Sequence, residues 1–187
     1  MKYYEWWGEP NSVDVRFPHR HFNERWWMVE GQPVSDWQDS LTATYVWDDD
    51  LAFNFGLARN AWPVFSPELR SFFEDHKPGL IQFLPFQLQK PDGSSRVSGY
   101  SVGQILRLVD CLDRNRTQVE DDWEPVNSWG DFATLRPIVL SQPLIGDEVL
   151  FRIKGMCGSI LIREDLKDLM ENKAFKGQRF DFVECTP

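Results

Sequence analysis

The same pattern of residues occurs twice in this chain, starting at Phe65 and again at Ile162. Each copy reads as the end of a strand, a short helix, a glycine and a second strand, with the helices expected at 67–76 and 163–172. Apolar residues recur at i, i+3 and i+4 in both helices: Leu69, Phe72 and Phe73 in the first, and Leu166, Leu169 and Met170 in the second. This spacing puts three apolar side chains on one face, so each helix has one side to bury.

The residues at the helix ends support the same boundaries. Ser66 followed by Pro67 is a favourable N-cap and first-turn pair. Gly79 and Gly177 are expected at the left-handed C′ position, where glycine is preferred. The two copies therefore predict two similar βαβ-like or hairpin-helix units in an α+β fold. We expect mostly antiparallel sheets with the two short helices packed on them.

The length of 187 residues predicts a single domain, 1–187, which can bury about 70% of its unfolded surface. Residues 1–62 are rich in tryptophan and in hairpin signals, and residues 63–187 carry the repeated unit. Strands are expected at 2–6, 13–17, 25–29, 42–47, 80–88, 134–140, 149–154 and 159–162, and a turn at 90–95. Residues 100–109 fit either a helical stripe or a half-buried strand, and the flanking glycines favour the strand.

The charge of the chain limits its partners. The net charge of -9 argues against nucleic-acid binding, which needs a basic surface to neutralise phosphates. No stretch has the length or apolar character of a membrane span or a signal-peptide core, so no membrane partner is expected. Three cysteines without CxxC spacing indicate free thiols rather than disulfides or a zinc site. These features predict a cytoplasmic protein.

Tryptophan is unusually frequent, with nine residues in the chain. Seven of them lie in the first third: Trp6, Trp7, Trp26, Trp27, Trp37, Trp47 and Trp62. Tryptophan serves both cores and interfaces, and for each one the core is the favoured location.

Few residues have the spacing that catalysis or metal binding requires. His19 and His21 would share a face on a strand, but no third ligand follows nearby. Asp110 and Asp113 could act as an acid/base pair, although turn capping and an ion pair with Arg114 or Arg116 are the favoured interpretation. The surrounding carboxylates would raise the pKa of the Cys111 thiol, which argues against a nucleophile. No cofactor fingerprint is present, so no cofactor is expected.

Three motifs resemble a known family: Val-Asp-Cys-Leu-Asp-Arg at 109–114, Phe-Arg-Ile-Lys-Gly at 151–155, and the segment 162–180. The chain is similar, from about Phe65 to Glu184, to the immunity proteins of bacterial polymorphic toxin systems, in the family numbered eleven, formerly a domain of unknown function. The first third matches only loosely. The resemblance implies a cytoplasmic protein without catalytic residues that binds a cognate toxin and blocks it.

Two classes of function are therefore compared. The first is an immunity protein that neutralises the C-terminal domain of its cognate toxin by stoichiometric occlusion. The alternative is a small cytoplasmic hydrolase or ligand-binding enzyme that uses Asp110 and Asp113; an adaptor without a toxin is a third reading. The absence of a convergent set of His, Cys and carboxylate residues favours binding over catalysis. The oligomeric state is left open, and a homo-oligomer is possible.

Two acidic segments that contain tryptophan are candidate toxin-binding sites. A protein interface requires an aromatic anchor surrounded by a charged rim, and both segments supply these residue types. The favoured segment lies in the long polar stretch 113–131, and the second follows the strand expected at 42–47. The candidate residues are Trp123, Asp121, Asp122, Glu124 and Trp129 in the first, and Asp48, Asp49 and Asp50 in the second.

Overall fold

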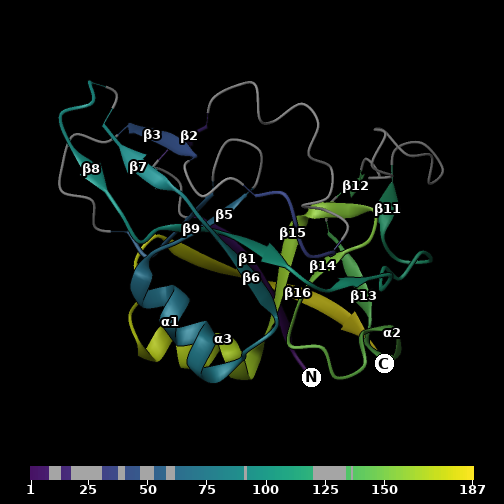
Figure 1. The fold of residues 1–187 in the computed structure, drawn as a ribbon. Coiled ribbons are helices and arrows are strands. Elements are labelled where there is room, and N and C mark those ends of the chain that lie inside the picture. The colour runs from purple at the N-terminus through teal and green to yellow at the C-terminus, as the bar shows by residue number, and fades with distance from the viewer. Residues whose placement is uncertain are drawn as a thin grey trace.

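A computed structural model describes the chain at residues 1–8, 14–17, 31–37, 41–46, 53–57, 62–90, 92–119, 134–135 and 137–187 (Figure 1). These residues form short strands and three helices. The helices are α1 (Pro67–His76), α2 (Gln142–Ile145) and α3 (Glu164–Asn172). No helix in these ranges is both long enough and apolar enough to cross a membrane.

The strands are short apart from those at the two ends of the chain and β15. They are β1 (Tyr3–Gly8), β2 (Asp14–Arg16), β3 (Thr42–Val46), β4 (Phe55–Leu57), β5 (Pro63–Phe65), β6 (Ile81–Pro85), β7 (Gln87–Gln89), β8 (Arg96–Val97), β9 (Ser101–Ile105), β10 (Leu108–Val109), β11 (Gln118–Val119), β12 (Thr134–Leu135), β13 (Val139–Ser141), β14 (Leu150–Ile153), β15 (Met156–Arg163) and β16 (Gln178–Thr186).

The strands form one large sheet and three smaller ones. The six-stranded sheet has the order β10-β14-β15-β1-β16-β13, and two four-stranded sheets have the orders β4-β5-β9-β6 and β2-β3-β7-β8. Strands β11 and β12 form a separate pair. Most neighbours are antiparallel, and β3–β7, β10–β14 and β13–β16 are parallel. The predicted α+β class with mostly antiparallel sheets is therefore confirmed.

The sequence repeat corresponds to two βαβ-like units, β5-α1-β6 and β15-α3-β16. In each unit a third strand lies between the two strands that the helix connects: β9 lies between β5 and β6, and β1 between β15 and β16. Both outer strands are antiparallel to the middle one, so they are parallel to each other. A helical crossover is the usual connection between such parallel strands. The expectation of two similar units is confirmed.

Helix α1 begins and buries its face as predicted. The Ser66 hydroxyl accepts a hydrogen bond from the Leu69 amide at 3.3 Å, which makes it the N-cap. Leu69, Phe72 and Phe73 are all buried. The expected helical face of α1 is therefore confirmed.

Helix α3 departs from the prediction at two positions. It begins at Glu164 rather than at 163, and Leu169 is 42% exposed although it was expected on the buried face. Leu166 and Met170 are buried, and Lys167 takes the third place. The Lys167 ammonium lies 5.0 Å from the centre of the Tyr4 ring and 2.7 Å from the Glu171 carboxylate. A long side chain can thus bury its stem while its charge stays paired.

The prediction that Gly79 and Gly177 occupy the C′ positions of the two helices is wrong. Both have positive φ, 81° for Gly79 and 85° for Gly177, but the helices end earlier, with Lys77 and Lys173 as C-caps. In the second unit Ala174 holds the left-handed position, with a φ of 53°. Gly177 instead permits a close approach, because a Cβ there would lie 2.3 Å from the Phe55 carbonyl oxygen.

Two of the expected strands are divided. The stretch 80–88 forms β6 and β7, which belong to different sheets: β6 pairs with β9, and β7 pairs with β3 beyond Pro85. The stretch 134–140 is likewise divided into β12 and β13, with Pro137 before β13. Proline lacks an amide donor, so it favours a break in strand pairing. The strand favoured for 100–109 is confirmed as β9 and β10, whereas 25–29 lies outside the described residues.

The helices and sheets enclose a core in which Trp6 is central. The Trp6 ring stacks on Phe55 with centroids 4.0 Å apart and makes an edge contact with Phe65 at 5.7 Å. The same cluster contains the buried faces of both helices, including Leu69 and Leu166. Figure 1 shows α1 and α3 side by side on one side of the strands. Both repeated units therefore bury their helices in one shared core.

Hydrogen bonds through Asn54 connect the start of α1 to the segment that follows α3. At the start of α1, the Asn54 side chain makes two hydrogen bonds. Its Nδ2 donates to the Ser66 hydroxyl at 2.9 Å, and its Oδ1 accepts from the Lys176 backbone amide at 2.9 Å. At the start of α3, the hydrogen bond from Arg163 lowers the pKa of the Asp165 carboxyl, and the charge of Lys77 adds to this shift. The start of α1 therefore lies beside the segment that follows α3.

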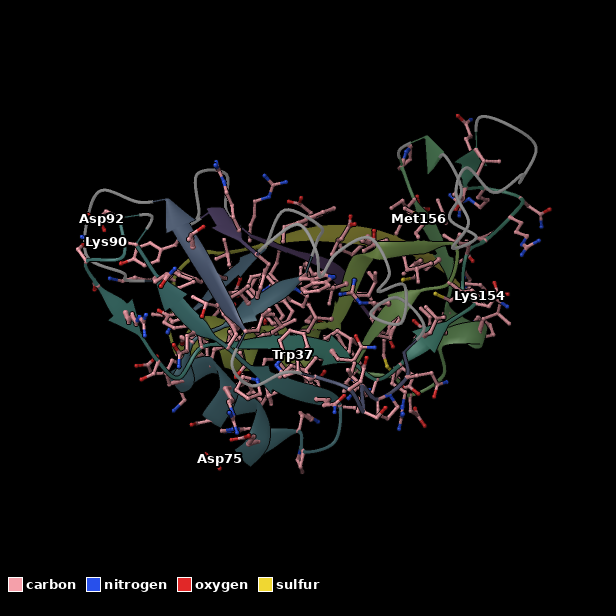
Figure 2. The ribbon with its side chains drawn as sticks, turned by 45° about the horizontal axis from the view of Figure 1, so that its top comes forward. Trp37, Asp75, Lys90, Asp92, Lys154 and Met156 are labelled. Carbon is pink, nitrogen blue, oxygen red and sulfur yellow. The ribbon has the colours of Figure 1, made fainter. Side chains whose placement is uncertain are left out.

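Residues 34–37, which precede β3, are hydrogen-bonded to β6 of the first unit. The Gln82 side chain accepts from the Val34 amide at 2.7 Å and donates to the Val34 carbonyl at 2.9 Å. The Trp37 indole donates to the Pro85 carbonyl at 2.6 Å, and Figure 2 shows its ring over the middle of the molecule. Among the described tryptophans, Trp6 and Trp62 are buried, and Trp7 and Trp37 are partly buried.

We expect Leu166→Ala to lower the free energy of unfolding by about 2 to 5 kcal/mol, because a fully buried leucine is truncated without a neighbour to fill the space. Leu169→Ala, three residues further on, removes a side chain that is 42% exposed and should cost below about 1 kcal/mol. Urea unfolding of both variants measures the difference. Equal losses would contradict the assignment of the buried face.

Candidate functional site

Asp110 and Asp113, the candidate acid/base pair, both have structural contacts. The Asp110 carboxylate lies 4.0 Å from Arg114 and 3.6 Å from Lys154, whose position is labelled in Figure 2. Asp113 accepts hydrogen bonds from the Asn115 amide and from the Thr186 hydroxyl, both at 3.0 Å. Asp113 therefore holds a turn and the last strand, and Asp110 forms the expected ion pair with Arg114.

The other predicted ion-pair partner has a different contact. The Arg116 guanidinium pairs with the Glu184 carboxylate on β16 at 2.6 Å, whereas the Arg116 backbone amide donates to the Asp113 carbonyl oxygen at 3.1 Å. The exposed Arg116 and Glu184 side chains connect the turn after Asp113 to the final strand. Sequence spacing alone does not identify this contact, because Glu184 is far from Arg116 along the chain.

Cys111 lies in the core between these two aspartates. Its side chain is fully buried among Leu112, Leu140 and Phe151. Burial raises the pKa of the Cys111 thiol to about 12, and the negative charge of Asp110 adds to the shift. The direction agrees with the prediction, although burial contributes more than the carboxylate. At neutral pH the thiol stays protonated and is a poor nucleophile.

We expect Cys111 to resist iodoacetamide in the folded protein at about pH 8, because alkylation requires an accessible thiolate. The same residue should react once urea unfolds the chain and restores the ordinary pKa. Peptide mass spectrometry after alkylation gives the modified fraction at Cys111. Complete modification under native conditions would show that the thiol is not buried as described.

The histidines do not form a metal site within the described residues. His76 lies in the last turn of α1, where its ring stacks on Phe72 and its Nδ1 lies 2.9 Å from the Phe72 carbonyl oxygen. These contacts account for His76 as a residue of the helix end. His19 and His21 lie outside the described residues. In the part of the chain that the structure describes, no three His, Cys, Asp or Glu residues are grouped as metal ligands.

The candidate toxin-binding residues all lie outside the described residues. Asp48, Asp49 and Asp50 fall between β3 and β4 in the sequence. Asp121, Asp122, Trp123, Glu124 and Trp129 fall between β11 and β12. Both segments therefore remain candidates on the sequence argument alone.

An exposed aromatic side chain on β16 was not predicted. Phe182 is 62% exposed and makes an edge contact with Tyr4, with ring centroids 5.8 Å apart. The Tyr4 hydroxyl donates to Glu164, which also pairs with Lys2 at 2.7 Å. Phe182 shares a face of β16 with the half-buried Phe180, because side chains alternate along a strand. Alternation identifies this face, but only the extent of α3 shows that Phe182 stays uncovered.

Two shallow hollows lie beside helix α1. One, of about 360 Å³, lies at the start of the helix and includes Asn54, Glu68, Tyr100 and Lys176 in its lining. Burial raises the pKa of Tyr100 to about 12, and its hydroxyl donates to the Phe53 carbonyl at 3.2 Å. The other, of about 230 Å³, lies at the end of the helix and is lined in part by Arg70 and Phe83.

The described polar side chains of Ser66, Asp110 and Asp113 act as a helix cap, an ion pair and a link between a turn and a strand. This is the arrangement of an α+β protein built around structural contacts. The chain belongs to the immunity protein family Imm11, whose family model matches residues 15–184. Comparison with curated proteins found no match.

Proposed function

We propose that this protein binds the C-terminal domain of a cognate toxin in the cytoplasm of the producing cell and neutralises it by stoichiometric occlusion. The observation that carries the proposal is the family match, which extends over residues 15–184 of the 187. The roles of Asp110, Cys111 and Asp113 as structural residues are in keeping with inhibition by binding rather than by catalysis. No cofactor is required for such a mechanism.

The charge of the chain supports a basic toxin as the partner. A net charge of -9 accelerates association with a positively charged protein. Toxin domains that act on nucleic acid need a basic surface, and acidic side chains on an inhibitor can occupy the positions of phosphates. The immunity protein itself would then bind neither nucleic acid nor membrane.

Co-expression tests the proposal directly. The C-terminal domain encoded by the upstream neighbouring gene is expressed with and without this protein, and survival of the cells is scored. The proposal expects survival only when both are present, together with a one-to-one complex on size-exclusion chromatography. Toxicity that is unchanged by an excess of folded protein would refute it.

A double variant distinguishes inhibition by binding from the enzymatic alternative. Asp110→Asn with Asp113→Asn removes both carboxylates of the candidate acid/base pair. It should lower stability, because the contacts to Lys154 and Thr186 weaken. If the folded double variant still binds the toxin but no longer protects, then a catalytic mechanism replaces occlusion.

We propose the segment around Trp123 as the toxin-binding site, and expect Trp123→Ala to weaken binding by at least about 2 kcal/mol, mainly through faster dissociation. The reason is that a buried aromatic anchor contributes most where the charged rim excludes water. Calorimetry on the folded variant measures the loss. Trp37→Ala is the matched control, since Trp37 lies in another segment and bonds to Pro85.

Charge reversal at Asp121 and Asp122 separates steering from anchoring. These changes should slow association, and the effect should be largest at low salt, where screening is weakest. Glu124 and Trp129 belong to the same proposed surface. Unchanged affinity in both sets of variants would reject this segment and favour Asp48, Asp49 and Asp50 instead.

A further inference from the structure

The two βαβ-like units match in strand register as well as in order. In the first unit Phe65 pairs with Ser101 and Val64 with Val102. In the second, their counterparts Ile162 and Leu161 pair with Tyr4 and Glu5. The counterparts are identified by the same offset that superimposes the two helix sequences. The first strand of each unit therefore meets its middle strand in one common register.

The third strand of each unit obeys the same register. Phe83 on β6 pairs with Gly103, and its counterpart Phe180 on β16 pairs with Trp6. At the far end of these strands, Ile81 pairs with Ile105 in the first unit. The equivalent pair in the second unit is Gln178 with Gly8. Because a slip of one residue would turn every side chain to the other face, agreement on both sides of the middle strand is a strong constraint.

The strands before β5 and β15, namely β4 and β14, also correspond. Strands β4 and β5 are antiparallel neighbours with Phe55 opposite Phe65. Strands β14 and β15 are antiparallel neighbours with Leu150 opposite Ile162, the counterpart of Phe65. Each unit is therefore a hairpin, a helix and a returning strand, completed by one further strand in the middle.

The helices carry the same side-chain arrangement. Arg70 and Glu74 form an i, i+4 ion pair at 2.8 Å in α1, and Lys167 and Glu171 form one at 2.7 Å in α3. Each of these cations also lies over an aromatic ring, but the rings are not counterparts: Arg70 lies over Phe83 on the returning strand, and Lys167 over Tyr4 on the middle strand. The correspondence therefore extends from backbone pairing to the ion pair on each helix.

The two units differ in the origin of the middle strand. In the first unit β9 follows β6 along the chain, after β7 and β8. In the second unit the equivalent strand β1 does not come after β16 but precedes the first unit in the sequence. We infer that the protein is an internal duplication with a circular permutation, in which β1 is the displaced last strand of the second copy.

The positions of the chain ends fit this inference. Strands β16 and β1 are antiparallel with Tyr3 opposite Val183, so the last and first residues of the chain continue beyond the same end of this pair. The labels N and C lie close together in Figure 1. A short turn could therefore connect β16 to β1, in the same sense in which β6 continues to β9.

The two middle strands also have complementary side chains at the equivalent position. A Cβ on Gly103 would lie 2.2 Å from the Phe65 ring, so that ring occupies the space beside Gly103. Its counterpart Trp6 projects into the shared core against the same Phe65. One large ring and one glycine fill the centre, where two large side chains would overlap.

The duplication separates the scaffold from the remaining segments. The units comprise β4–α1–β6 with β9, and β14–α3–β16 with β1. The proposed toxin-binding residues at 48–50 and 121–129 lie outside both units in the sequence. This part of the inference rests on the proposed function, and it expects a permuted chain to keep its protective activity.

A circular permutant of the full chain tests the inference. Pro187 is joined to Met1 through a glycine-rich turn, and the chain is opened after Gly8, so that β1 follows β16 directly. The matched control has the same joint but is opened in the β7–β8 turn after Gly93, where the structure has open space. Each is made with a short and a long linker, and thermal unfolding is followed by tryptophan fluorescence.

Both permutants are expected to unfold cooperatively, with a Tm within about 5 °C of the parent. If the control folds and the permutant opened after Gly8 does not, β1 depends on the segment that follows it, and the inference is wrong. Failure of both with either linker also overturns it, because β16 then cannot continue into β1. A permutant that folds but loses protection upholds the duplication and counts against the placement of the toxin-binding residues outside the units.

Discussion

Replacing Trp6 by alanine is expected to lower the free energy of unfolding by about 3 to 5 kcal/mol. The Trp6 side chain is 1% exposed and contacts aromatic rings from both repeated units, including Phe65 and Phe73 of the first and Phe180 of the second. Its loss leaves a cavity between elements that cannot easily move together, because strands of two sheets form the walls. Urea unfolding, followed by circular dichroism, measures the loss.

Two further variants show whether the loss arises from packing at this position. Trp6→Phe keeps most of the buried ring, and within the described chain the indole nitrogen has no hydrogen-bond partner to lose, so the cost should be below about 2 kcal/mol. Phe182→Ala removes an exposed ring from a neighbouring strand and should cost below about 1 kcal/mol. Similar losses for Trp6→Ala and Phe182→Ala would show that Trp6 is not central.

Gly177→Ala is expected to destabilise the protein by about 3 to 5 kcal/mol. The φ of 85° is unfavourable for alanine, and the new Cβ would lie 2.3 Å from the Phe55 carbonyl oxygen. The clash involves backbone and would displace Lys176, whose carbonyl accepts hydrogen bonds from the Asn54 and Phe55 amides. The connection between the two units should weaken as a consequence.

Gly79→Ala is the matched control, since Gly79 occupies the equivalent junction between helix and strand in the first unit. Its φ of 81° imposes a similar backbone strain, but a Cβ there would have no atom within 4 Å. The expected cost is only about 1 to 2 kcal/mol. Thermal unfolding of the two variants compares strain alone with strain plus contact, and equal costs would contradict the close approach at Gly177.

The two similar units bury their helices together in this chain. One shared core contains the apolar faces of both helices, so each unit supplies part of the surface that the other buries. Segments between the units can then vary in sequence without altering this core. Under the proposed function, such a division would let recognition residues change while the scaffold stays stable.

The candidate site was only partly predictable from the sequence. The turn at Asp113 follows from the tendency of aspartate to accept hydrogen bonds from amides two residues ahead, which is a local property. The exposed position of Phe182 depends on how far α3 extends across the sheet, so alternation along β16 was insufficient to predict it. The segments around Trp123 and Asp48 remain proposals from residue type and spacing.

The sequence by itself determined the features that depend on near neighbours. The bounds of α1, the Ser66 cap, the buried face of Leu69, and the occurrence of two similar units all follow from residues a few positions apart. Local hydrogen bonds and helical periodicity govern them, so the pattern of the chain was enough. The resemblance to immunity proteins likewise depended on the order of motifs along the chain.

Only the tertiary structure decided how distant segments meet. The place of β1 between β15 and β16, the exposure of Leu169 with burial of Lys167, and the role of Gly177 against Phe55 all involve partners far apart in the sequence. Strand pairing of this kind is fixed by the simultaneous fit of many side chains in one core, and no local pattern contains that information. The strand β1 therefore lies in the middle of the six-stranded sheet, between β15 and β16, although it comes from the start of the sequence and they come from its end.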